Sequence, residues 1–234
     1  MSNPLRPVPQ PPSAVFVDAG GVLVLPDLEM TCAHLGRAEL TEEQRYHAFF
    51  RAFERRDESR PEQEWLWEAF ADEVAADDAE AIAALTTKEV DPWYPGCVAA
   101  PGASAFLRTL FDAGIPTIVV SNANGTVAEM LRAAGVCQVG DGPLAPVTAI
   151  IDSHVVGVAK PNPRIFHIAR QHVAHVELQD AVHVGDALWS DVAAADAAGI
   201  PVVHLDPERT CAAPDAHEHA VALDDVLEQI GVDD

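Results

Sequence analysis

The sequence predicts an α/β protein built on a doubly wound, Rossmann-like parallel sheet, with a small all-helical cap inserted into it. Short apolar runs lack the polar alternation of a half-exposed sheet, as expected of strands covered on both faces. Helical segments that end at glycine alternate with these runs. One long helical segment interrupts the alternation. With 234 residues, 49% of them hydrophobic, the chain can form a core domain and a small insert.

The predicted strands are the apolar runs at residues 14–18, 117–121, 147–151, 181–185 and 201–205. The predicted helices between and after them are residues 101–113, 126–134, 191–198 and 224–230. Gly114, Gly135 and Gly199 stand where the first three of these helices should stop. This order of strand, helix and glycine is typical of a doubly wound sheet.

The domain boundaries follow from the interruption between the first and second strands. Residues 27–98 are helical in pattern and far too many for a crossover connection. We expect a catalytic core formed by residues 14–26 and 99–234, and a helical cap formed by residues 27–98. Residues 1–13 are rich in proline and are expected to be a flexible arm rather than a signal peptide.

Composition excludes several classes of partner. The chain has 37 acidic and 14 basic residues, a formal net charge of −23, which disfavours nucleic acid and anionic membranes. No apolar run approaches the ~20 residues that cross a bilayer. The four cysteines are scattered, as in a protein with reduced thiols. We therefore expect a cytoplasmic protein that acts on a small molecule. The sequence is silent on oligomeric state.

Two candidate functional residues follow the first two strands. Asp18 ends the first strand and enters the turn Ala19-Gly20-Gly21. Ser121 and Asn122 end the second, where a hydroxyl and an amide can donate to a phosphate oxygen. In parallel sheets, ligands bind at the carboxyl ends of the strands. Each residue alone is equally compatible with an ordinary turn.

Further candidates follow in the second half of the chain. Lys160 precedes Pro161 and is one of two lysines in the sequence; it can be a cation for phosphate, or a surface lysine. Asp186 and Asp191 follow the fourth strand, and two carboxylates one turn apart suit a hard cation such as Mg²⁺. Asp191 can instead, or in addition, cap the next helix.

Two histidine pairs are considered as zinc ligands. His172 and His175 share a helical turn, and His217 and His219 lie in a polar tail. A structural zinc site needs four ligands, and no third ligand lies within reach of either pair in the sequence. The sequence therefore predicts no zinc site.

The succession of Asp at a strand end, Ser-Asn at a strand end, Lys-Pro and Gly-Asp-x-x-x-x-Asp resembles the four motifs of the haloacid dehalogenase superfamily. The resemblance covers residues 14–205. It implies that Asp18 is the nucleophile and that Ser121, Asn122 and Lys160 bind the phosphoryl group. It also implies that Asp18, the carbonyl of Gly20, Asp186 and Asp191 hold Mg²⁺. The implied activity is hydrolysis of a small phosphate monoester through an aspartyl phosphate.

Gly20 departs from the family pattern. Most phosphatases of the superfamily have an acid–base aspartate two residues after the nucleophile, and general acid–base help is typically worth ~10²–10⁴-fold. Three alternatives stay open: a phosphatase that works without it, a 2-haloacid dehalogenase, or a weakly catalytic binding or regulatory protein. Gly185-Asp186 favours the first, since dehalogenases of the family need no metal. Asp27 and Glu29 are the nearest replacement acids in the sequence.

Overall fold

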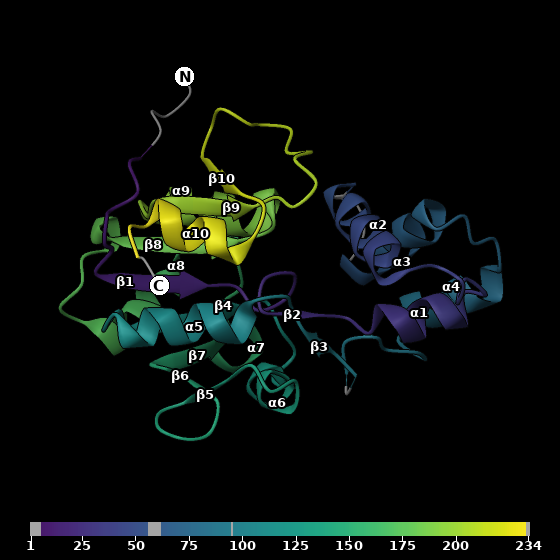
Figure 1. Cartoon of the computed structure of the whole chain (residues 1–234), viewed down its shortest axis with the longest axis horizontal. Helices are drawn as coiled ribbons and strands as arrows, with labels where there is room; N and C mark the ends of the chain where they lie inside the picture. The colour runs from purple at the N-terminus through teal and green to yellow at the C-terminus, as the bar shows by residue number, and fades with distance from the viewer. Residues whose placement is uncertain (1–5, 56–61, 95, 233–234) are drawn as a thin grey trace. The chain divides into compact units, whose positions relative to one another are not determined.

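A computed structural model describes residues 6–55, 62–94 and 96–232, without the side chains of residues 62–64. The chain divides into two compact units, which are treated separately below (Figure 1). The first unit contains the chain up to Val24, then Ala99–Asp206, and continues from Cys211. The second contains Leu25–Val98 and Pro207–Thr210.

The first unit is built on a six-stranded sheet in which every pairing is parallel. The order is β10-β9-β8-β1-β4-β7. These strands are β1 (Ala14–Val17), β4 (Thr117–Ser121), β7 (Ala149–Asp152), β8 (Ala181–Gly185), β9 (Val202–Leu205) and β10 (Glu218–Ala220). Strands β1, β4, β8 and β9 are buried along their whole length, because helices cover both faces. The predicted fold class is confirmed.

Helices pack on the two faces of this sheet. On one face α8 (Arg164–Ala169) and α9 (Ala193–Ala198) bury Phe16, Ile118 and Val120. The helices α5 (Ala103–Asp112) and α10 (Leu223–Gln229) contact each other and lie in front of the strands in Figure 1. Phe16 and Phe166 stack at 5.6 Å between ring centroids. Each buried ring contributes roughly 1.5–3 kcal/mol, so this core holds the strand ends in fixed positions.

The remaining elements of the first unit are short. They are α6 (Val127–Ala133), β5 (Cys137–Val139), β6 (Ala145–Val147), α7 (Ser153–Val156), the 3₁₀ turns Arg170–Val173 and Leu178–Asp180, and a π-helical turn over Leu188–Val192. Strands β5 and β6 form a separate two-stranded sheet. This corrects the predicted strand at 147–151, since Val147 ends β6 and the sheet strand β7 begins at Ala149.

Two other predictions need correction. The helix predicted at 191–198 begins at Ala193, because the π-helical turn containing Asp191 precedes it. Residues 218–220, read as polar tail, form the edge strand β10. Of the predicted arm, residues 1–5 lie outside the described part of the chain; further on, the Ser13 amide donates to the Asp180 carbonyl at 2.8 Å. The arm's flexibility stays a prediction.

The second unit is helical. Its helices are α1 (Leu28–His34), α2 (Glu42–Glu54), α3 (Glu62–Glu73) and α4 (Ala79–Thr86). Thr41 caps α2 through a capping box with Gln44, and Asp78 caps α4. Phe49, Phe53, Trp65 and Trp93 make ring contacts within the unit. No helix in the described ranges is long and apolar enough to cross a membrane. A cap role for this unit stays a prediction.

The chain passes between the units at two short strands. They are β2 (Val24–Leu25) and β3 (Val98–Ala99), which pair as a two-stranded sheet. The predicted boundaries at 26/27 and 98/99 fall close to these strands.

Candidate active site

The topology brings the ends of β1 and β8 together. These strands are neighbours, and from β1 the chain continues to β4 on the opposite side. The strand order therefore reverses at β1, and in open parallel sheets ligands bind at such a reversal. Asp18 directly follows β1, and Asp186 directly follows β8. Both carboxylates are buried.

Lys160 lies between two of the predicted carboxylates. Its Nζ is 2.9 Å from Asp18 Oδ1 and 2.6 Å from Asp191 Oδ1. Burial lowers the pKa of Lys160, but the two carboxylates outweigh burial and raise the pKa above its usual value. The ammonium group is therefore charged at neutral pH and is held toward the nucleophile predicted from the sequence.

The backbone of Lys160 is held by Asn122, another predicted site residue. The Asn122 side-chain amide donates to the Lys160 carbonyl at 2.9 Å, and the Lys160 amide donates to Asn122 Oδ1 at 2.8 Å. Both ends of the Asn122 side chain are thus engaged by the chain itself. Asn122 thus holds the backbone of Lys160, and its contact with a phosphoryl group stays a prediction.

Asp191 is completely buried and is surrounded by donors. Its Oδ1 accepts from Lys160 and from His183 Nε2, the latter at 2.7 Å, and its Oδ2 accepts from Ser190 Oγ at 3.0 Å. Burial raises the pKa of Asp191, but Lys160 and His183 outweigh burial and lower the pKa. Asp191 is not a helix cap. Its occupied oxygens suit it to orient Lys160.

Gly185 makes the position of Asp191 possible. A Cβ atom on Gly185 would come within 2.4 Å of both Cβ and Cγ of Asp191, too close for any side chain. The Gly-Asp motif therefore contains glycine for a packing reason, since the buried carboxylate lies directly against the end of β8.

The surroundings of Asp18 have opposing effects on the pKa of its carboxyl group. Burial raises the pKa of Asp18, and Lys160 opposes that effect. The Ala19 amide donates to Asp18 Oδ1 at 2.7 Å. The chain thus supplies one cation and one N–H to this carboxylate, and burial still disfavours its charged form.

Asp186 is the unsatisfied group of the site. Both of its carboxylate oxygens are buried, and neither has a hydrogen-bond partner among the described residues. Burial and the charges of Asp18 and Asp191 raise the pKa of Asp186 well above its usual value. A buried carboxylate in such surroundings is unfavourable unless a cation accompanies it.

The three carboxylates form a group that fits a divalent cation. One oxygen from each of Asp18, Asp186 and Asp191 lies within 4.8 Å of the others. Lys160 is the cation that contacts this group in the described part of the chain, so three ionised carboxylates would leave two negative charges uncompensated. Carboxylate oxygens are the ligands that Mg²⁺ prefers. The residues present therefore fit the predicted magnesium ion.

Ser121 and Gly20 lie at the same edge of the sheet. Ser121 is the buried last residue of β4, and continuing the pairing of Val17 with Val119 places it beside the turn after Asp18. Gly20 forms an isolated bridge with Val24. It is not among the residues with positive φ, whereas Gly21 has φ of 80°. Gly20 therefore has no backbone requirement for glycine.

Sequence reasoning missed Gly21 and His183. A Cβ on Gly21 would lie 1.7 Å from Asp186 Oδ2, so only glycine permits this approach. The signal was the second glycine after Asp18. His183 lies in the middle of β8 and is fully buried. A histidine within an otherwise apolar strand was the signal for it, because a buried imidazole needs polar partners.

Sequence comparison identifies related proteins. Residues 12–199 match the model of the haloacid dehalogenase-like hydrolase family. A bovine protein, haloacid dehalogenase-like hydrolase domain-containing protein 3, is 34% identical over 99 residues, which are 42% of this chain and 36% of the bovine chain. The match thus spans about a third of that relative's length.

Solved structures with the same fold include both phosphatases and dehalogenases. A HAD family hydrolase from Deinococcus radiodurans, with bound phosphate and sodium, has a TM-score of 0.65 at 22% identity, covering 95% of this chain and 98% of the other. A HAD phosphatase from Thermococcus onnurineus has a TM-score of 0.59 at 20% identity, with coverages of 94% and 98%. The L-2-haloacid dehalogenase of Xanthobacter autotrophicus has a TM-score of 0.56 at 18% identity, with coverages of 93% and 98%. The family match over most of the sequence, on a core of this fold, shows that the chain belongs to the haloacid dehalogenase-like hydrolases.

Proposed function

We propose that this hydrolase cleaves a small phosphate monoester with the help of Mg²⁺, through a phosphoryl group carried on Asp18. The observation that carries the proposal is the buried carboxylate of Asp186, whose two oxygens have no hydrogen-bond partner among the described residues. An enzyme that needed no cation would gain nothing from this unfavourable group. A bound divalent cation would offset the free-energy cost of burying this carboxylate.

The reaction proposed for Asp18 has two steps. In the first, a carboxylate oxygen of Asp18 attacks phosphorus, the bond to the ester oxygen breaks, and the leaving oxygen takes a proton from solvent water. In the second, water attacks the same phosphorus and gives up a proton to solvent, the bond to Asp18 breaks, and phosphate leaves with the carboxylate restored. Catalysis of such a transfer is mainly positioning and charge stabilisation. Lys160, 2.9 Å from Asp18, fits the role of holding a phosphoryl oxygen.

The bound cation would screen the charge between the anionic nucleophile and the anionic substrate. We assign it to Asp18, Asp186 and the backbone carbonyl of Gly20, as the family resemblance implies. Asp191 was expected among its ligands and belongs to the same group of carboxylates. Because the oxygens of Asp191 accept from Lys160, His183 and Ser190, we propose that Asp191 supports this centre by orienting Lys160.

An assay panel tests this proposal. Phosphate monoesters and 2-haloacids are offered with Mg²⁺ and with a chelator, and release of phosphate and of halide is measured. We expect phosphate release that needs Mg²⁺ and is lost in Asp18→Asn. The matched control is Asp112→Asn, which makes the same change at an exposed residue of α5.

The panel separates the alternatives. Halide release that is insensitive to chelator would establish the dehalogenase reading and overturn ours. A folded protein that turns over neither class would be a binding or regulatory member of the family. Phosphate release by Asp18→Asn at the wild-type rate would contradict the covalent step.

A further inference from the structure

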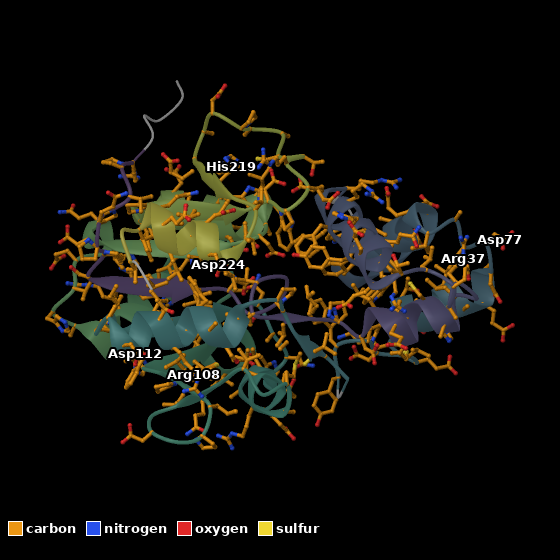
Figure 2. All side chains as sticks on the ribbon, in the orientation of Figure 1. Arg37, Asp77, Arg108, Asp112, His219 and Asp224 are labelled. Atoms are coloured by element: carbon orange, nitrogen blue, oxygen red, sulfur yellow. The ribbon has the colours of Figure 1, made fainter. Side chains whose placement is uncertain are left out.

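A second group of metal-binding side chains lies outside the candidate active site. His204, Cys211, His217 and His219 each offer a ligand atom, and these atoms lie within 4.8 Å of one another. His204 is on β9, and His219 is on β10, where Figure 2 labels it. Cys211 and His217 lie in the loop between these strands. The sequence analysis found no third ligand for His217 and His219, and the fold supplies two.

Strand pairing explains how the group forms. Strands β9 and β10 run in parallel at one edge of the sheet, and His204 is directly opposite His219. Side chains opposite each other on neighbouring strands point to the same face, as do those two residues apart on one strand. His204 and His219 therefore share one face, and His217, at the end of the loop, has its ring centroid 5.1 Å from that of His204. Ring centroids of His217 and His219 are 4.4 Å apart.

The closest distances in the group match the edges of a zinc tetrahedron. Zn–N distances of ~2.0–2.1 Å and a Zn–S distance of ~2.3 Å place two nitrogen ligands about 3.3 Å apart, and nitrogen and sulfur about 3.6 Å apart. His204 Nδ1 is 3.2 Å from His217 Nε2. Cys211 Sγ is 3.5 Å from the same His217 nitrogen. The two distances from His217 Nε2 thus already have the required length.

Hydrogen bonds outside the group prepare two of its members. His204 Nε2 is 3.0 Å from the Asp186 carbonyl, which can only accept, so His204 has its N–H there and its Nδ1 lone pair faces the group. Zinc-binding histidines are commonly oriented in this way. The Ala213 amide donates to Cys211 Sγ at 3.4 Å, which fixes the direction of this side chain.

His219 offers a further ligand atom. Its Nε2 is a buried nitrogen without a hydrogen-bond partner in the described part of the chain. Buried polar atoms normally have a partner, and a metal ion would supply one here.

Two of the candidate ligands are the buried residues of the loop. Between Pro207 and His217 the only buried residues are Cys211 and His217; the others are partly or fully exposed. At the start of the loop Glu208 pairs with His47 and Arg51, and the Cys211 amide donates to Asp206 Oδ2 at 3.1 Å. Long connections without secondary structure of their own are uncommon in compact domains unless something stabilises them. A metal ion bound by Cys211 and His217 would stabilise this one.

We propose that His204, Cys211, His217 and His219 form a structural zinc site that fastens the loop between β9 and β10. Four protein ligands leave no open position for water or substrate, which distinguishes a structural site from a catalytic one. One thiolate with three imidazoles suits Zn²⁺ rather than Mg²⁺, which prefers oxygen. The site is independent of the hydrolytic activity proposed above.

The test measures metal content and ligand identity directly. The full chain, without a histidine tag, is purified in zinc-free buffer, and bound zinc is quantified by mass spectrometry. We expect one zinc per chain and higher thermal stability with zinc than after chelation. Replacement by Co²⁺ should give the visible bands of a tetrahedral centre and a thiolate-to-cobalt charge-transfer band.

Variants assign the ligands. Cys211→Ser should abolish the charge-transfer band and weaken zinc affinity at least about 100-fold, since even groups that only hydrogen-bond to zinc ligands contribute 10–100-fold. His219→Gln, at the partly exposed edge strand, tests the same site if Cys211→Ser fails to fold. His172→Ala removes an exposed histidine elsewhere and should leave zinc binding unchanged. Asp186→Asn should also retain zinc, which separates this site from the magnesium site.

Two results would overturn the proposal. One is a folded wild-type chain that keeps no more zinc than Cys211→Ser or His219→Gln. The other is a cobalt-loaded protein that has no thiolate charge-transfer band.

Discussion

The Asp186 carboxylate is unfavourable in the folded chain without a cation and is needed when a cation binds. Its raised pKa reflects burial and the charges of Asp18 and Asp191, while no side chain of the described residues hydrogen-bonds to it. In the folded chain without a cation, this carboxylate holds its proton more tightly than in the unfolded chain. The contribution of Asp186 to the stability of the metal-free chain is therefore fully present below the pKa that Asp186 has in the unfolded chain. It is lost as pH rises through the pKa of Asp186 in the folded chain.

The first prediction concerns Asp186→Asn. Without Mg²⁺ the variant should be more stable than wild type by roughly 1–3 kcal/mol at neutral pH, because it removes a buried uncompensated charge. The advantage should shrink as pH falls. Urea unfolding with a chelator at several pH values measures it. With Mg²⁺ only wild type should gain stability. A metal-free variant less stable than wild type across this range would contradict the account of Asp186.

The second prediction compares two adjacent glycines. Gly21→Ala should destabilise the fold by several kcal/mol, because φ of 80° is unfavourable for alanine and its Cβ would overlap Asp186. Gly20→Ala should cost about 1 kcal/mol or less, since Gly20 is not among the residues with positive φ. Thermal unfolding of both proteins checks this. Equal losses would show that the turn does not distinguish the two positions.

The third prediction concerns the leaving group. With no carboxylate at position 20, wild type should hydrolyse esters with acidic leaving groups fastest. Gly20→Asp should speed poor leaving groups by ~10²-fold or more and good ones less, as general acid help does. The rate is measured against leaving-group pKa in both proteins. A flat dependence in wild type would reveal another acid. Asp27 is a weak candidate, because its Oδ1 already caps α1 by accepting from the Met30 amide.

At the scale of elements, hydrogen bonds of the Asn122 side chain connect the loop that contains Lys160 to the end of β4. Asn122 directly follows β4 and makes both backbone contacts of Lys160. Asn122→Ala should lower kcat by ~10²-fold, because small misplacements of catalytic groups have effects of this size, with a smaller effect on KM. Asn124→Ala is the control: Asn124 lies in the loop after β4, and its side chain accepts from Thr126. Unchanged kcat in Asn122→Ala would remove its positioning role.

The elements also show what the sequence could and could not reveal. Strands such as β4 and β8 were predictable because continuous apolar runs mark strands covered on both faces. Strand β10 was not, since Glu218-His219-Ala220 has no apolar pattern and is a strand only through its pairing with β9. Asp18 and Asp186 were predictable from their places at strand ends, and Lys160 from its place before Pro161 as one of two lysines in the sequence. The approach of Gly21 to Asp186 depends on distances that no local pattern contains.

At the scale of the whole molecule, charge should govern the encounter with substrate. A formal net charge of −23 repels a phosphate dianion over distances comparable to the Debye length, ~30 Å at 0.01 M salt and ~10 Å at 0.1 M. We expect kcat/KM for a phosphate monoester to rise several-fold between these salt concentrations, at saturating Mg²⁺. Steady-state kinetics in NaCl and KCl measures the effect. A fall in kcat/KM would indicate that local positive charge outweighs the global repulsion.

Selection should also act differently on the two neighbouring glycines, Gly20 and Gly21. Under the proposed function, any substitution of Gly21 places a side chain where the Asp186 carboxylate lies, so selection should keep glycine there. Gly20 meets no such demand from its backbone angle. A lineage can therefore acquire or discard a carboxylate at position 20 in one mutational step, while the nucleophile and the cation site are inherited unchanged. Under the proposed function, relatives that differ at position 20 should differ in the leaving groups they accept.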